Sequence, residues 1–177
     1  MSLVQPLRDS SLSHVLLHTV RWLGIGYVQA GVLLLVIALG AVLRHRAAAA
    51  GAWALLALAV SGLAANVLKV LIHRPRPWVS VPPPESWAGY LRLHQLQSFP
   101  SGEATTSFAI AFVLGSEFAT LRAPLLLAAC AVAAARVVVG NHYPSDVWGG
   151  AMLGMAVAQW LSHLARSRAR RGTGAGA

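Results

Sequence analysis

Residues 49–72 read AAGAWALLALAVSGLAANVLKVLI and are followed directly by His-Arg-Pro-Arg-Pro. This stretch contains no charged residue before Lys69. A helix needs roughly 20 apolar residues to cross the hydrocarbon core of a bilayer, and this run reaches that length. The stretch therefore predicts a membrane-spanning helix that leads into a basic, proline-rich segment.

The rest of the chain repeats this pattern. Its composition is 56% hydrophobic and only 11% charged, whereas soluble domains carry roughly 25% charged residues. So few charges cannot cover a water-facing surface, so lipid must solvate much of the chain. We expect an all-α, polytopic membrane helix bundle with about five transmembrane helices. The further spans are expected at about residues 25–43, 101–121, 123–139 and 145–164.

The segments outside the spans suggest one membrane domain over residues 1–177. Residues 1–24 form either an N-terminal amphipathic segment or an extension of the first span. The loop 73–99 is rich in proline, tryptophan and tyrosine, which favours the head-group level. It is interpreted either as an interfacial lid or as a passive connector. The tail 165–177 is basic, which next to an apolar span predicts contact with membrane lipids and not with nucleic acid.

Unusual polar residues gather at span ends that all lie on one side of the membrane. Arginine forms forked hydrogen bonds with phosphate, and the start of a helix presents free N–H groups to an anion. These residue types predict a site for a phosphate group. The phosphate-binding candidates are Lys69, Arg76, Ser101, Gly102 and Arg136.

Two residues at the start of the last span predict nucleophilic catalysis. His142 can attack phosphorus once its other ring nitrogen is held. Asp146 lies four residues further on, one helical turn away, and is expected to hold that nitrogen. A metal-dependent phosphatase is not expected, because two-metal sites need several carboxylates and the chain has only five. We expect no cofactor and no metal, with the fixed cations stabilising the transferring group.

Three motifs carry a family resemblance. They are Lys69-Val-Leu-Ile-His-Arg-Pro-Arg76-Pro77, Pro100-Ser101-Gly102, and Arg136-Val-Val-Val-Gly-Asn-His142-Tyr-Pro-Ser-Asp146. In this order they resemble the type 2 phosphatidic acid phosphatase (PAP2) superfamily, over about residues 50–165. The resemblance is to bacterial membrane lipid phosphatases that include undecaprenyl-diphosphate phosphatases. It implies a six-helix-like core, a phosphohistidine on His142, and a lipid phosphate or diphosphate as substrate.

One departure from the family pattern affects the chemistry. Glu103 stands where the family has the histidine that is understood to protonate the leaving group. Glu103 is therefore a candidate catalytic acid, with His73 or His94 as alternatives. The leaving group of a diphosphate needs little protonation. Glutamate in place of histidine at position 103 therefore predicts a preference for lipid diphosphates such as polyprenyl diphosphate. The alternatives are a lipid phosphotransferase and a weakly active or non-catalytic lipid-phosphate binder.

The distribution of basic residues predicts the orientation. With five spans, each side of the membrane receives seven Lys or Arg residues. Three on one side, Lys69, Arg76 and Arg136, belong to the expected site, which leaves seven against four. Cytoplasmic loops carry the excess of Lys and Arg. We therefore expect a multi-pass protein of a bacterial inner or plasma membrane, with a cytoplasmic tail and a site that faces the periplasm or the cell exterior.

Overall fold

The computed structural model describes residues 19, 20, 22–80, 86, 88 and 94–174. Throughout this part the regular structure is helical, which confirms the all-α prediction. The described residues form five long helices and one short 3₁₀ helix, η1. Their bounds are α2 Gly26–Val42, α3 Ala47–Ile72, η1 His94–Leu96, α5 Gly102–Glu117, α6 Ala119–Val138 and α7 Pro144–Gly174.

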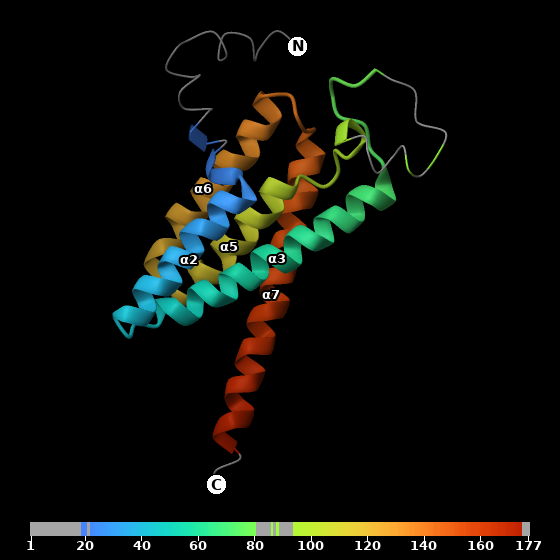
Figure 1. Cartoon of the computed structure of the whole chain (residues 1–177). Coiled ribbons are helices and arrows are strands. Elements are labelled where there is room, and N and C mark those ends of the chain that lie inside the picture. The colour runs from blue at the N-terminus through green and yellow to red at the C-terminus, as the bar shows by residue number, and fades with distance from the viewer. Residues whose placement is uncertain (1–18, 21, 81–85, 87, 89–93, 175–177) are drawn as a thin grey trace.

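The bundle is organised around α5, which packs against α3, α6 and α7, while α2 packs against α3 (Figure 1). Small side chains make this close packing possible. Ala54, Ala57, Ala109 and Ala158 are fully buried where α3, α5 and α7 meet. Without a strong hydrophobic driving force between helices in lipid, such small residues allow the backbones to approach closely.

Two glycines bring α7 onto α5. A Cβ atom on Gly150 would lie 2.6 Å from the carbonyl oxygen of Ser101, and one on Gly154 would lie 2.1 Å from that of Thr105. Both distances are too short for any side chain. The GxxxG spacing predicts close helix packing from the sequence, and the structure identifies the partner as α5 of the same chain.

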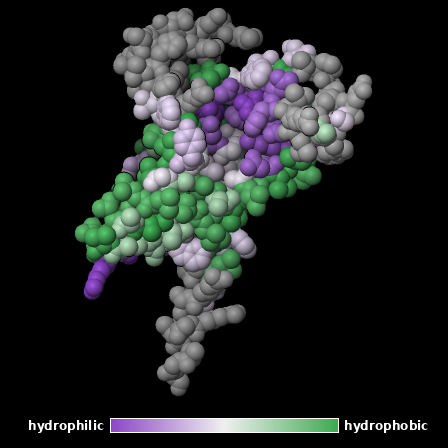
Figure 2. Space-filling view, in the orientation of Figure 1, coloured by the Kyte–Doolittle hydropathy of each residue, from purple (hydrophilic) through white to green (hydrophobic). Residues whose placement is uncertain are grey.

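The outer surface of the bundle is apolar. Large hydrophobic side chains are exposed on several helices, among them Leu35, Leu63, Leu127 and Trp160, and Figure 2 shows a hydrophobic band across the face in view. By length and hydropathy, α3 and α6 are able to cross a membrane, and α2 is a shorter apolar helix. The predicted number of five spans is therefore not confirmed, although the apolar band fits a membrane protein.

The helix ends differ from the predicted spans in three places. α5 ends at Glu117 and α6 begins at Ala119, because Phe118 between them has non-helical backbone angles (φ −126°, ψ 87°). α7 continues to Gly174, well past the predicted end at 164. Residues 165–171 are alanine, arginine and serine, which carry no helix-breaking proline or glycine. Most of the predicted N-terminal segment 1–24 and part of the loop 73–99 lie outside the described residues.

Candidate functional site

The predicted site residues meet at one end of the bundle, where α3 ends, α5 begins, and α6 leads into α7 (Figure 1). A hydrophilic recess lies at this end, above the apolar band (Figure 2). The residues come from positions 69 to 146, so the helix arrangement brings distant parts of the sequence together. This convergence agrees with the expectation that all of them share one side.

The first motif is fixed by the way α3 ends. Lys69 lies in the last turn, and His73 closes the helix in a left-handed conformation (φ 52°), its N–H donating to the carbonyl of Lys69. Two backbone hydrogen bonds then join residues 74–76, which follow α3, to the loop that precedes α5. Arg76 N donates to Gln95 O at 2.9 Å, and Ser98 N donates to Arg74 O at 2.9 Å. These bonds hold the basic segment beside the start of α5.

The start of α5 has the features of an anion site. Ser101 is the N-cap residue and is fully buried, and its N–H donates to the carbonyl of Asp146 at 2.9 Å. A Cβ atom on Gly102 would lie 3.3 Å from Lys69 Nζ, so glycine lets the ammonium group approach the helix end. Ser101 Oγ and Arg76 Nε are buried without a hydrogen-bond partner among the described residues. Together they offer a hydroxyl, cations and a helix N-terminus to an oxyanion.

The structure corrects the expected partner of His142. Its Nδ1 lies 2.8 Å from the carbonyl oxygen of Ser98 and 3.6 Å from Asp146 Oδ2. The backbone carbonyl of Ser98 is therefore the hydrogen-bond acceptor for Nδ1–H, and Asp146 acts at longer range. The reason is that Asp146 is occupied elsewhere: Oδ2 accepts from Ser98 Oγ at 2.5 Å and from Tyr143 N at 2.9 Å. With Nδ1 protonated, Nε2 is the ring nitrogen with a lone pair for attack.

Arg74 is a site residue that the sequence did not single out. Its Nη1 lies 2.6 Å from Asp146 Oδ1 and donates to Ser145 Oγ at 2.8 Å, and its guanidinium stacks over the Tyr143 ring at 4.3 Å. Ser98 was missed as well. The only sequence signal was the repeated Arg-Pro of the first motif, which does not say which arginine faces the aspartate. Arg74 contacts Asp146, Asp146 accepts from Ser98 Oγ, and Ser98 O accepts from His142, so the four residues form one chain of contacts.

The third cation, Arg136, is paired with Glu103. Arg136 Nε lies 2.8 Å from Glu103 Oε2, and Nη1 donates to Oε1 at 3.1 Å. The Arg136 side chain is only 4% exposed, whereas that of Glu103 is 29% exposed. Glu103 is the second residue of α5, where a carboxylate is favoured by the helix dipole. Glu103, which departs from the family pattern, thus lies among the candidate phosphate-binding residues and is paired with one of their cations.

Burial and neighbouring cations determine the protonation of the nucleophile candidate. Burial, followed by the Arg76 guanidinium, lowers the pKa of His142 from 6.5 to about 4. The hydrogen bond to Ser98 O and the charge of Asp146 oppose this shift without reversing it. Burial also lowers the pKa of Arg76, which still leaves it charged near neutrality. His142 is therefore neutral at pH 7, as a nucleophile must be.

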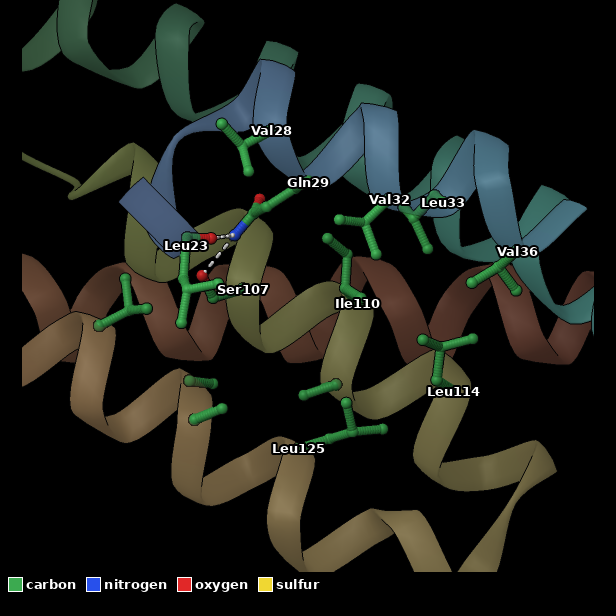
Figure 3. Close-up of a pocket in the computed structure, with 14 residues that line it drawn as sticks. Leu23, Val28, Gln29, Val32, Leu33, Val36, Ser107, Ile110, Leu114 and Leu125 are labelled. Atoms are coloured by element: carbon green, nitrogen blue, oxygen red, sulfur yellow. Dashed lines mark hydrogen bonds between the residues drawn. The ribbon is translucent and has the colours of Figure 1, made fainter. Parts of the chain in front are cut away.

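An apolar groove lies between α2, α5 and α6 (Figure 3). Its volume is about 210 Å³, and its walls include Val32, Ile110 and Leu114. A Cβ atom on Gly24 would lie 2.7 Å from Val132 Cγ1 in the groove wall and 3.2 Å from Glu103 Oε2. The groove and the candidate site therefore approach each other near Gly24.

A polar side chain in the groove wall joins two of the helices. Gln29 Nε2 donates to Ser107 Oγ at 2.7 Å and to Leu23 O at 3.1 Å, which joins α2 to α5 (Figure 3). No group of three or more His, Cys, Asp or Glu side chains that could hold a metal occurs within the described part of the chain. The site therefore consists of fixed cations, a histidine and two carboxylates next to an apolar groove.

Comparison with known proteins agrees with this arrangement. The model of the PAP2 superfamily matches residues 50–170. A lipid A 1-phosphatase from Rhizobium johnstonii is 36% identical over 115 residues, which cover 64% of this chain and 46% of the relative. A lipid A 1-phosphatase from Rhizobium etli is 35% identical over 121 residues, covering 64% and 48%. The chain thus spans about half the length of the curated relatives that it matches.

Two solved structures share the fold. The crystal structure of Aquifex aeolicus LpxE superposes with a TM-score of 0.70 at 26% identity, covering 91% of each chain. A transmembrane PAP2 type phosphatidylglycerolphosphate phosphatase from Bacillus subtilis superposes with a TM-score of 0.70 at 22% identity, covering 91% of this chain and 80% of that one. The similarity to the second structure concerns the fold alone.

Proposed function

Because the chain belongs to the PAP2 superfamily, we propose that it removes a phosphate from a membrane lipid through a phosphohistidine on His142. The match over residues 50–170 confirms the resemblance that the three motifs predict. The observation that carries the proposal is the arrangement at the start of α5. There Lys69 lies against Gly102, and the hydroxyl of Ser101 and Nε of Arg76 are buried without a hydrogen-bond partner among the described residues.

The proposed reaction has two steps. In the first, Nε2 of His142 attacks phosphorus, an N–P bond forms and the bond to the leaving oxygen breaks. Ser98 O accepts from Nδ1–H at 2.8 Å and so orients the ring. The cations Lys69, Arg76 and Arg136 stabilise the charge on the transferring group. In the second step, water attacks phosphorus, which releases inorganic phosphate and returns the electron pair to His142.

The apolar surroundings support a lipid as the substrate. The lining of the groove between α2, α5 and α6 is almost wholly aliphatic, and Gly24 lies between Val132 in its wall and Glu103. A phosphate held at the start of α5 would direct its ester oxygen and hydrocarbon chain toward such a groove. We expect one chain of the lipid to lie there, because burial of each CH₂ group contributes about 0.8 kcal/mol.

Glu103 supports a preference for lipid diphosphates such as a polyprenyl diphosphate. An alkoxide leaving group needs a proton in the transition state, and general acid catalysis contributes about 10²–10⁴-fold. A phosphate monoester has a second pKa of about 6 and departs with little protonation. A site with glutamate in place of the acid histidine therefore loses less rate on diphosphates than on monophosphates.

The experiment compares a polyprenyl diphosphate with phosphatidate for the wild type, Glu103→His and Glu103→Gln, with phosphate release measured in detergent. We expect the wild type to prefer the diphosphate, and Glu103→His to raise the monophosphate rate much more than the diphosphate rate. Equal loss of both activities in Glu103→Gln would identify Glu103 as a working general acid and contradict the leaving-group argument. Faster wild-type hydrolysis of phosphatidate would refute the preference itself.

Lipid A 1-phosphate is a second candidate substrate, since two relatives that are 35% and 36% identical are lipid A 1-phosphatases. It belongs in the same substrate panel.

His142→Ala tests the mechanism for every substrate: we expect it to remain folded and to lose turnover by orders of magnitude. Residual activity above about 10% of the wild type would exclude His142 as the nucleophile. Transfer of phosphate to a second lipid, without phosphate release, would indicate the phosphotransferase.

A further inference from the structure

The contact between Glu103 and Arg136 is the most unusual one of the site. The Glu103 carboxylate forms an ion pair with an arginine that, in the proposed reaction, binds phosphate. Both carboxylate oxygens take part: Oε2 lies 2.8 Å from Nε, and Oε1 accepts from Nη1 at 3.1 Å. Of these two contacts, the one from Nη1 is a hydrogen bond, and the one at Nε is a close approach of opposite charges without hydrogen-bond geometry. An arginine whose charge is balanced at this distance attracts a second anion less strongly.

The two partners differ in their freedom to move. Arg136 is buried on α6, with 4% of its side chain exposed, whereas 29% of the Glu103 side chain is exposed. The carboxylate is therefore the partner that can be displaced. Gly24 lies against it on one side, since a Cβ atom there would be 3.2 Å from Oε2. An incoming oxyanion that is to meet the full charge of Arg136 has to displace Glu103 from this position.

The charge balance points the same way. Lys69, Arg76 and Arg136 supply three positive charges, and Glu103 cancels one of them before any ligand arrives. Arg74 does not add a further charge to the site, because it is paired with the buried Asp146 at 2.6 Å. An oxyanion that binds while Glu103 stays in place meets a weaker field and the repulsion of a nearby carboxylate.

We propose that Glu103 is a specificity-determining residue that competes with tetrahedral oxyanions for Arg136 and so weakens the binding of inorganic phosphate. This proposal rests on the proposed function, because it concerns the same phosphate site. It goes beyond the leaving-group argument, since it concerns affinity for the free anion and not the rate of bond cleavage. Inorganic phosphate is the second product of the proposed reaction, so this competition promotes its release after each turnover.

The test is a calorimetric titration of inorganic phosphate into the full-length protein in detergent. The variants are Glu103→Gln and Glu103→His, which both remove the negative charge, and the control is Glu117→Gln. Glu117 is the exposed last residue of the same helix, at its far end. We expect both Glu103 variants to bind phosphate at least about tenfold more tightly than the wild type and the control, which corresponds to about 1.4 kcal/mol.

A second arm separates competition at Arg136 from a general change in charge. In an Arg136→Gln background, Glu103→Gln should tighten phosphate binding by less than about threefold, because the contested partner is absent. An equal gain in both backgrounds would overturn the proposal. So would unchanged or weaker binding in both Glu103 variants, which would assign Glu103 a structural or a phosphate-binding role.

The failure of the proposed function looks different. If neither the wild type nor any of the Glu103 variants binds phosphate, the phosphate site itself is wrong, and both proposals fall together. If all of them bind with one affinity, only the competition is refuted. Thermal unfolding of each variant in the same detergent identifies any protein that has failed to fold. Because two different replacements are made at Glu103, loss of one variant leaves the comparison intact.

Discussion

Arg74→Gln is the change that most directly tests the connection from Arg74 to His142. Arg74 contacts Asp146, Asp146 accepts from Ser98 Oγ, and Ser98 O holds Nδ1 of His142. Glutamine retains a polar side chain but removes the charge and the short contact with Asp146. Asp146 is then left as a buried carboxylate without its cation.

The magnitude follows from the burial of the two partners. Removing one partner of a fully buried ion pair destabilises a protein by about 3–5 kcal/mol, whereas exposed pairs contribute about 0.2–1 kcal/mol. Asp146 is 0% exposed and Arg74 is 34% exposed, so solvent screens only one side of the pair. We expect Arg74→Gln to lower the free energy of unfolding by about 1–3 kcal/mol, between the two limits.

The effect on activity should be mainly on kcat. Arg74 acts through Asp146 and Ser98 on the orientation of His142 and, being paired with Asp146, is not part of the phosphate-binding set. We expect kcat to fall about tenfold, equivalent to about 1.4 kcal/mol, with KM nearly unchanged. The assay is phosphate release from a lipid diphosphate over a range of substrate concentrations. Arg122→Gln, an exposed arginine at the other end of α6, is the control.

Two results would refute this reasoning. If Arg74→Gln lowers kcat no more than Arg122→Gln does, the connection to His142 has no catalytic role. If KM rises while kcat is unchanged, Arg74 binds phosphate directly and is a fourth cation of the site. In either case a fall in thermal stability alone would show only that the ion pair supports the fold.

Three further predictions concern pH, packing and orientation. Because His142 attacks in its neutral form and its pKa is lowered to about 4, kcat/KM, corrected for the phosphate ionisation of the free substrate near pH 6, should fall only as the pH drops through about 4; a further acid limb near the ordinary value of 6.5 would contradict the buried, cation-flanked environment. Gly154→Ala should lower the free energy of unfolding in detergent by about 1–3 kcal/mol, because its Cβ would lie 2.1 Å from Thr105 O. Gly31→Ala has open space around its Cβ and should be neutral or stabilising by up to about 1 kcal/mol; equal effects at the two glycines would argue against the α5–α7 contact. A reporter fused after Ala177 should behave as cytoplasmic, given the excess of basic residues on that side, and periplasmic behaviour would reverse the proposed orientation.

The all-α class of the fold, and the residues of the candidate site, could be predicted from the sequence alone. Long apolar runs with few charges predict membrane helices, because an unsatisfied backbone is too costly in lipid. The spacing of Lys69, Arg76, Arg136 and His142 at the ends of these runs predicted that they share one side, and the structure brings their segments together at one end of the bundle. These features follow from local composition and from positions along the chain, which the sequence contains directly.

Only the tertiary structure decided which side chains are partners. From spacing alone, Asp146 was the expected hydrogen-bond partner of His142, one helical turn away. In the folded chain, His142 instead donates to the carbonyl of Ser98, 44 residues away, and Asp146 accepts from Arg74, 72 residues away. The pairing of Glu103 with Arg136 and the packing of Gly154 on Thr105 likewise join separate helices. Such contacts depend on helix rotation and crossing, which are set by the packing of many small side chains at once. No local pattern in the sequence encodes them.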